Sequence, residues 1–232
     1  MADGEEINRA EISVTNECVF ACYFCFMKKW RDMDETLNLT EQDMQFLLEL
    51  FPDLKKIEVI GGEPLKHPRL AEIVNELVGV PKVTVTTNGY LLPEGQEGVD
   101  YIAQFPENTK FYMSLTSYHE RNYAVRNRDM WEQAVVFEQT CQAAGRGNGF
   151  LYVGPDKVQK LDFIRGLGIT GKVRFNDVYD LGGGADVEGA KEYTHNLSNR
   201  IFMGPNVQFY KTARDFSQGI NQLDLTQLNP QT

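Results

Sequence analysis

The sequence predicts an α/β fold, a partial (β/α)6 TIM-like barrel, on the strength of three observations. Strand-like and helix-like segments alternate, and the connections between them are short. Strands joined by helical crossovers form a parallel sheet that curls toward a barrel. A complete eightfold barrel takes about 250 residues, whereas the repeats here end near residue 180 of 232. We therefore expect an open barrel over residues 1–180 and, packed on it, a C-terminal extension over residues 181–232 with a hairpin and a flexible tail.

Apolar periodicity and turn residues place the individual elements in order. Met44, Leu47 and Phe51 share one helical face after the helix cap at Thr40. Gly145 marks the end of another helix. Strands are expected at residues 7–15, 56–60, 82–87, 110–116, 150–153 and 172–178. Helices are expected at residues 40–51, 67–78, 101–105, 130–144 and 156–167, and the hairpin at residues 201–210.

Composition narrows the class of protein. The formal net charge of −10 and a pI near 4.9 argue against a nucleic-acid partner. No stretch approaches the ~18 apolar residues of a membrane span, and the acidic first residues do not resemble a signal peptide. Four cysteines in a chain of this length do not indicate a fold that is held together by disulfides. These features predict a cytoplasmic protein that has no membrane segment.

Three of the four cysteines, Cys18, Cys22 and Cys25, stand within eight residues. Thiolates are soft ligands that suit iron–sulfur clusters. Three ligands leave a coordination position open, as catalytic metal sites do. The spacing therefore suggests a cubane cluster with one iron free to bind another molecule. The alternative is a zinc site whose further ligands come from Cys141 or from the histidines at 67, 119 and 195.

The order Cys-x3-Cys-x2-Cys, with aromatic Phe24 before the last cysteine, resembles the radical S-adenosylmethionine (radical SAM) superfamily. The resemblance continues after the second expected strand, where Gly61-Gly62-Glu63-Pro64 matches the family's Gly-Gly-Glu motif. It implies a [4Fe–4S] cluster on Cys18, Cys22 and Cys25, whose open iron chelates the methionine part of SAM. It also implies an electron donor such as flavodoxin or ferredoxin, and a 5′-deoxyadenosyl radical that abstracts hydrogen from a substrate.

The resemblance and the rule that barrel sites lie at the carboxyl ends of strands give a set of cofactor-binding candidates. Two glycines allow close backbone approach and positive φ, and in the family this segment meets the SAM amino group. Ser114 and Thr116 are candidates for the ribose or carboxylate of SAM, and many relatives have an aspartate at the position of Thr116. Arg174 and Asn176 are candidates for the SAM carboxylate. The full set is Tyr23, Phe24, Gly61, Gly62, Glu63, Pro64, Thr87, Asn88, Ser114, Thr116, Arg174 and Asn176.

The absence of cysteines after Cys141 predicts a single cluster without auxiliary ones. We expect a radical SAM enzyme that acts on a peptide or a small molecule. Glycyl-radical-enzyme activases and carboxy-deazaguanine synthases are alternatives, because both are short and carry a Gly-Gly-Glu-Pro segment. A noncatalytic iron–sulfur or zinc-binding partner protein is the alternative from another class.

Overall fold

The computed structural model describes residues 7–22, 25–153, 157–176, 179–180, 191–192, 200–211, 215–216 and 222–223. Its centre is an eight-stranded sheet in the order β10-β9-β1-β2-β3-β4-β5-β6. The strands of this sheet are β1 Arg9–Ser13, β2 Lys56–Ile60, β3 Val83–Thr87, β4 Thr109–Thr116, β5 Gly147–Val153, β6 Lys172–Asn176, β9 Arg200–Met203 and β10 Phe209–Tyr210. Two short strands, β7 Tyr179–Asp180 and β8 Lys191–Glu192, pair separately.

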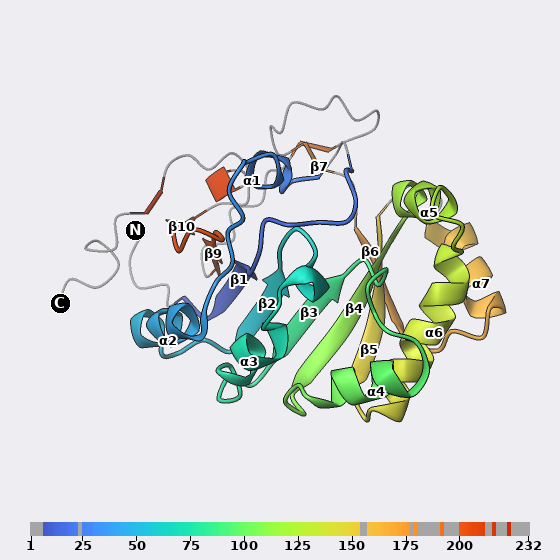
Figure 1. The fold of residues 1–232 in the computed structure, drawn as a ribbon, viewed down its shortest axis with the longest axis horizontal. Helices are drawn as coiled ribbons and strands as arrows, with labels where there is room; N and C mark the ends of the chain where they lie inside the picture. The colour runs from blue at the N-terminus through green and yellow to red at the C-terminus, as the bar shows by residue number, and fades with distance from the viewer. Residues whose placement is uncertain are drawn as a thin grey trace.

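Most helices lie along the outside of the curved sheet, whereas α1 lies above the strands in the view of Figure 1. They are α1 Lys28–Arg31, α2 Glu41–Leu50, the 3-10 helix η1 Pro64–Lys66, α3 Leu70–Asn75, α4 Gly95–Ala103, α5 Ser117–Ala124, α6 Met130–Ala143 and α7 Lys157–Gly166. None of the helices in these ranges is both long and apolar enough to cross a membrane.

The partial barrel is confirmed. Strands β1 to β6 are parallel neighbours in chain order, as right-handed crossovers require. The sheet order is linear, with β6 at one end and β10 at the other, so the strands described do not close on themselves.

The C-terminal segment joins the sheet beside its first strand. β9 pairs in parallel with β1, with Arg9 opposite Arg200, and β10 returns antiparallel to β9. An ion pair between Arg200 on β9 and Glu11 on β1 also joins these two strands. Local sequence patterns do not reveal it, because the paired residues are almost the whole chain apart.

Several helical elements differ from expectation, and for α3 and α5 the reason is local. The helix expected at residues 67–78 starts later and is shorter, as α3, because Pro68 holds His67 in an extended conformation. α4 begins at Gly95, earlier than expected. α1 and α5 were not predicted; α5 starts where the Thr116 side chain accepts a hydrogen bond from the His119 backbone N–H.

Alternation along the strands separates an apolar face from a polar one. Ile12, Val59 and Val85 are fully buried among other core side chains. Their neighbours Glu11, Glu58 and Thr84 line a cavity on the concave face. The hydrophobic core therefore lies between sheet and helices, and the inside of the barrel is left for polar groups.

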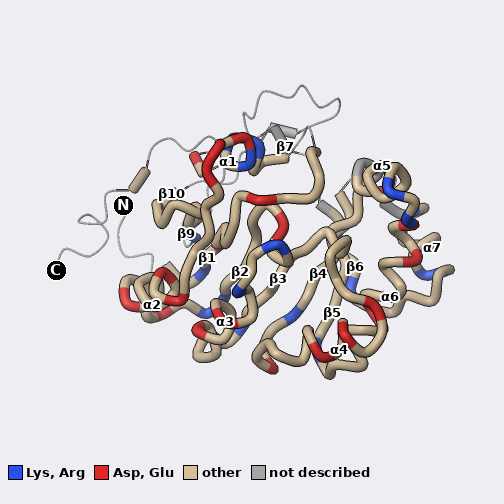
Figure 2. The backbone as a smooth tube through the Cα atoms, viewed as in Figure 1, with Lys and Arg blue, Asp and Glu red and all other residues tan. Residues whose placement is uncertain are grey.

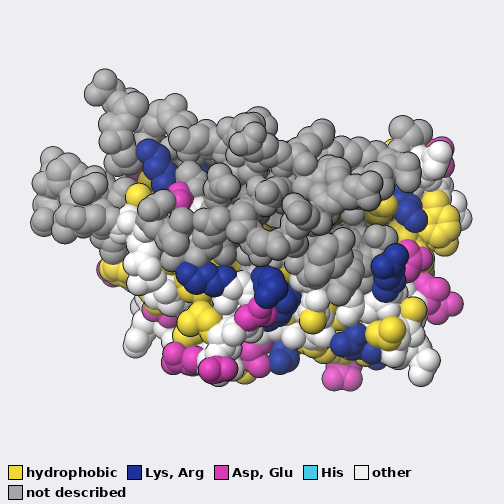
Figure 3. Space-filling view, turned by 90° about the horizontal axis from the view of Figure 1, so that it is seen from above, with side chains coloured by type: hydrophobic (Ala, Val, Ile, Leu, Met, Phe, Trp, Pro, Cys, Tyr) yellow, Lys and Arg dark blue, Asp and Glu magenta, His cyan; other side chains and the backbone are white. Residues whose placement is uncertain are grey.

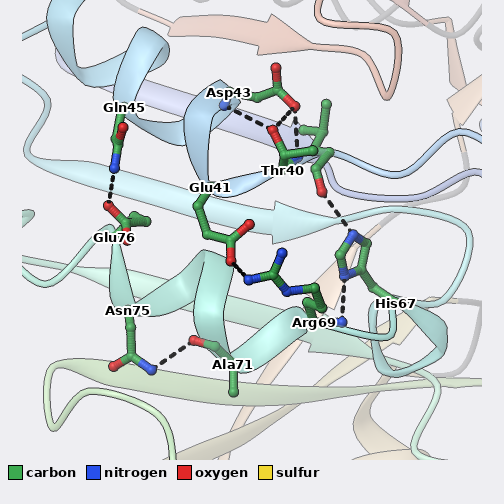
Figure 4. A network of polar contacts seen from close by, with 10 residues as sticks. Thr40, Glu41, Asp43, Gln45, His67, Arg69, Ala71, Asn75 and Glu76 are labelled. Carbon is green, nitrogen blue, oxygen red and sulfur yellow. Dashed lines mark hydrogen bonds and ion pairs between the residues drawn. The ribbon is translucent and has the colours of Figure 1, made fainter.

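A polar network joins α2 to α3 on the outside (Figure 4). Thr40 and Asp43 form a reciprocal capping box at the start of α2, and Glu41 pairs with Arg69. The His67 Nδ1 accepts from the Arg69 backbone N–H at 3.1 Å, so its Nε2 carries the proton that faces the Leu39 carbonyl oxygen at 2.9 Å. Both ring nitrogens of His67 thus form hydrogen bonds within the fold, so neither is available to bind zinc.

A second apolar cluster holds α1, the helix after the cysteines, against the C-terminal segment; we call this contact the clamp. Trp30 on α1 stacks on Phe216 with ring centroids 6.1 Å apart, and its Nε1–H donates to the Phe216 carbonyl oxygen at 2.9 Å. Phe202 and Tyr210 complete the cluster. The C-terminal segment therefore holds the helix that follows the three cysteines.

We expect Trp30→Ala to lower the free energy of unfolding by about 3–5 kcal/mol, because a large buried side chain is removed. Trp30→Phe should cost only about 1 kcal/mol, since it loses mainly one hydrogen bond. Urea unfolding of the cluster-free chain measures both. Equal stability of Trp30→Ala and wild type would contradict the clamp.

Candidate active site

The cysteine segment follows β1 and is held by its own backbone neighbours. Asn16 is buried, and its Nδ2 donates to the carbonyl oxygens of Trp30 at 2.9 Å and Glu35 at 2.8 Å. Its Oδ1 accepts from the Leu37 backbone N–H at 2.8 Å. One amide therefore closes the whole loop that contains the cysteines. Sequence reasoning missed this role, although an asparagine directly after a strand is a signal for such local bonds.

Cys18, Cys22 and Cys25 line one cavity, and none of them is in a disulfide. The backbone N–H of Phe20 donates to the Cys18 sulfur at 3.4 Å, and the Asn88 Nδ2 lies 4.0 Å from it. Burial raises the pKa of Cys18 to about 11 and that of Cys22 to about 12. The thiols are therefore neutral by themselves, and a metal cation would have to displace their protons on binding.

The Gly61-Gly62 segment lies directly against the backbone that leads to Cys18. The Gly62 N–H donates to the Thr15 carbonyl oxygen at 2.8 Å, and the Glu63 N–H donates to that of Glu17 at 2.7 Å. A Cβ at position 62 would lie 2.1 Å from the Glu17 oxygen. The expectation of positive φ was wrong, because positive-φ glycines of the described chain include neither of these two. Glycine is required here because two backbone segments touch.

Glu63 joins this segment to the end of β3. The carboxylate accepts hydrogen bonds from the backbone N–H of Leu65 at 3.0 Å and of Asn88 at 2.7 Å, and from the Thr87 hydroxyl. The side chain is almost fully buried, and burial raises the pKa of Glu63 to about 7. Thr87 and Asn88, predicted as cofactor contacts, are thus held in place by Glu63.

This raised pKa gives a pH dependence with a definite sign. The folded state favours the protonated carboxyl between the ordinary pKa of 4.5 and about 7, so stability falls as pH rises through this window. The loss is at most about 3 kcal/mol. Glu63→Gln should flatten the slope of unfolding free energy against pH, as measured by urea unfolding from pH 4.5 to 8. An unchanged slope would show that Glu63 ionises as freely as in an unfolded chain.

The end of β4 presents polar groups to the same cavity. Ser114 and Thr116 both line it, together with His119 from the polar segment that follows this strand. The His119 Nδ1 lies 2.9 Å from the Ser114 carbonyl oxygen, so this nitrogen carries the proton and Nε2 is the acceptor. Burial lowers the pKa of His119 and favours this neutral form. A threonine three residues before His119 is a sequence signal for a helix cap, and this cap places His119 beside the end of β4.

Arg174 also lines the cavity, and its guanidinium lies toward the amino ends of the strands, which form the floor of the barrel. Its guanidinium lies over the Tyr112 ring, 4.5 Å from the centroid, and Tyr112 is one inward position below Ser114 on β4. A Cβ at Gly149 would lie 2.6 Å from this ring, so glycine makes room for it. The guanidinium therefore faces the floor of the barrel and not its rim.

The cavity has a volume of about 530 Å³, within the usual range for ligand sites. The predicted site residues that line it are Cys18, Cys22, Cys25, Gly61, Gly62, Glu63, Thr87, Asn88, Ser114, Thr116 and Arg174. Pro64 is buried at the start of η1 and does not line it. Tyr23 and Phe24 lie outside the described residues, as does the side chain of Asn176 at the end of β6.

The donor set fits a cluster bound by three cysteines. Three thiols free of disulfides open on one cavity beside a glycine segment, and thiolate is the ligand that iron–sulfur clusters use. Among the residues described, no three Cys, His, Asp or Glu side chains converge on a single ion. A cubane does not require this convergence, because each cysteine binds a different iron.

Comparison with known proteins agrees with this arrangement. The model of the Radical SAM superfamily matches residues 12–161. The GTP 3′,8-cyclase of Aquifex aeolicus is 28% identical over 186 residues, covering 74% of this chain and 56% of that protein. The probable GTP 3′,8-cyclase of Sulfolobus acidocaldarius is 34% identical over 93 residues, covering 39% and 30%. The chain thus spans about half or less of the length of these curated relatives.

Solved structures show the same fold. Streptococcus suis SuiB, bound to its precursor peptide SuiA, has a TM-score of 0.70 at 11% identity, covering 95% of this chain and 62% of that chain. HydG, a maturase of the [FeFe]-hydrogenase, has a TM-score of 0.56 at 13% identity, covering 75% and 43%. At these identities the likeness concerns the fold alone.

Proposed function

The chain belongs to the radical SAM superfamily, and from this premise we propose that Cys18, Cys22 and Cys25 hold one [4Fe–4S] cluster that binds and reductively cleaves SAM. One observation carries the proposal. The three cysteines and the Gly-Gly-Glu segment line one cavity, at the carboxyl ends of neighbouring strands whose backbones are hydrogen-bonded. When bound, the cluster would supply an electron to SAM and so generate the 5′-deoxyadenosyl radical that removes hydrogen from the substrate.

The chain's own residues would position SAM. The rigid backbone of Gly61 to Glu63 supports binding of the amino group of SAM, because it is fixed against the cysteine segment. Ser114 and Thr116 are our candidates for the ribose or carboxylate. The acceptor Nε2 of His119 would accept a hydrogen bond from a donor on SAM or on substrate. Tyr23 and Phe24 remain proposed contacts of SAM or the cluster.

The substrate is proposed to be a small molecule or a peptide, and the electron donor a flavodoxin or ferredoxin. The relatives named GTP 3′,8-cyclase support the small molecule, since their names state a nucleotide substrate. The SuiB structure contains a peptide, but at 11% identity it supports the fold and not the substrate.

Anaerobic reconstitution with iron and sulfide tests the proposal. We expect about four irons per chain and 5′-deoxyadenosine that forms only when dithionite is present. Deuterium at the 5′ carbon of SAM should appear in product if SAM is regenerated, whereas stoichiometric 5′-deoxyadenosine indicates that it is consumed. Stoichiometric zinc and no cleavage of SAM would overturn the proposed cluster.

A further inference from the structure

The floor of the cavity is charged, although it lies inside a barrel. Glu11 on β1 and Glu58 on β2 are direct neighbours in register, and both line the cavity with Lys56 and Arg200. Arg200 pairs with Glu11 and Lys56 pairs with Glu58. These four charges cancel in pairs.

Arg174 is the fifth charged residue on this floor, and none of the ion pairs between described residues includes it. Within the described ranges, no carboxylate forms an ion pair with its guanidinium, whose partner is the Tyr112 ring. The carboxylate of Glu63, higher in the cavity, is occupied by its own donors. Of the described residues on the floor, three are therefore basic and two acidic.

Further cations surround the lower opening. Lys82 directly precedes β3, Lys110 is the second residue of β4 and Lys172 is the first residue of β6, so these cations lie at the amino ends of the strands. Along the backbone, Lys and Arg positions occur on strands β2, β4 and β6, and Asp and Glu positions are frequent on the outer helices α2, α3 and α4 (Figure 2). Seen from above, basic and acidic groups are intermixed along the described margin (Figure 3). In a chain of net charge −10, three basic and three acidic residues line this cavity.

Two buried donors on the floor point to a missing partner. The Thr84 hydroxyl and the Arg200 Nε are buried, and among the residues described neither has a hydrogen-bond partner. Both residues line the cavity, and Thr84 is only 2% exposed. Leaving a buried donor unpaired costs about 1–3 kcal/mol, so such groups are normally satisfied by a bound molecule or water.

We propose that the floor of this cavity is an oxyanion site, in which Arg174, Arg200 and Thr84 bind a phosphate or carboxylate group of the substrate. The substrate is then an anionic small molecule, held by its charged end with its remainder toward the cysteines. This inference rests on the proposed function, which places the substrate in this cavity. It also gives another role to Arg174, which its place on the last predicted strand of the barrel had made a candidate for the carboxylate of SAM.

Titration with inorganic phosphate and with acetate, in separate calorimetric experiments at constant ionic strength, tests the site. We expect Arg174→Gln to weaken binding at least roughly tenfold and Arg174→Lys to weaken it less. Thr84→Val should weaken binding without lowering the melting temperature, because it also removes an unpaired hydroxyl. Lys160→Gln on the outer helix α7 is the matched loss of a cation and should bind as wild type.

The outcomes separate the possible roles. A higher affinity for phosphate than for acetate supports a phosphorylated substrate. A higher affinity for acetate supports a substrate with a carboxylate group. Equal affinity of wild type and Arg174→Gln, or no binding above chloride, overturns the site. If Arg174→Gln bound SAM more weakly but phosphate as tightly as wild type, Arg174 would be a contact of SAM. This result would also overturn the oxyanion site. The cluster-free chain is titrated in parallel, so failure of SAM cleavage and failure of the oxyanion site are distinguished.

Discussion

Replacement of Cys22 by alanine is expected to abolish cluster assembly and SAM cleavage together. Cys22 is the most buried of the three cysteines that line the cavity, and alanine offers no ligand for iron. Two remaining thiolates cannot hold three corners of a cubane. Anaerobic reconstitution, followed by iron analysis, visible absorbance and assay of 5′-deoxyadenosine, should give background values. The same result is expected for Cys18→Ala and Cys25→Ala.

Cys141→Ala is the matched control. Cys141 is fully buried on α6 among core side chains and does not line the cavity. Its loss should cost roughly 1 kcal/mol of stability, as for a small core residue, and leave iron content unchanged. If Cys141→Ala lost the cluster, or Cys22→Ala kept it, the ligand assignment would be wrong.

The second large effect is expected for Gly62→Ala. The added Cβ would fall 2.1 Å from the Glu17 oxygen and 2.8 Å from that of Asn16. These are backbone atoms that cannot turn away, so the segment that leads to Cys18 must move. Displacement on the order of 1 Å near reacting groups can reduce a rate on the order of 100-fold. We expect reduced iron content and at least that loss in formation of 5′-deoxyadenosine.

Gly79→Ala provides the comparison for Gly62→Ala. Nothing lies within 4 Å of a Cβ at Gly79, and its φ is not positive. Alanine should be neutral there or stabilise slightly, by restricting the unfolded chain. If both glycine variants behaved as wild type in iron content and rate, the contact between the two segments would not determine the site.

The sequence allowed the barrel and the upper part of the site to be predicted, because both depend on local signals. Alternating strands and helices fix the order of a parallel sheet, and a parallel sheet brings its carboxyl ends together. Cys18 and Gly62 could therefore be placed side by side without coordinates. Their actual contact, backbone against backbone, could not be foreseen from residue types.

The lower part of the site was not predicted, because it depends on side-chain direction and distant pairing. Arg174 was placed on the correct strand, but only the ring of Tyr112 shows that it turns toward the floor. Arg200 reaches that floor because β9 pairs with β1, a contact between residues with no local sequence signature. In the upper part of the site, the position of His119 depends on a turn after β4 that strand periodicity does not describe.

The pairing of β9 with β1 also determines when the site is completed during protein synthesis. The cysteines leave the ribosome early, whereas Arg200 is joined to Glu11 and Phe216 to Trp30 across separations of 189 and 186 residues. At about 5–20 residues per second, synthesis of the intervening chain takes on the order of ten to forty seconds. Throughout that interval β1 lacks its second neighbour, and the helix after Cys25 lacks its clamp. Stable loading with iron should therefore follow release of the C-terminal segment, and the thiols need a reducing environment until then.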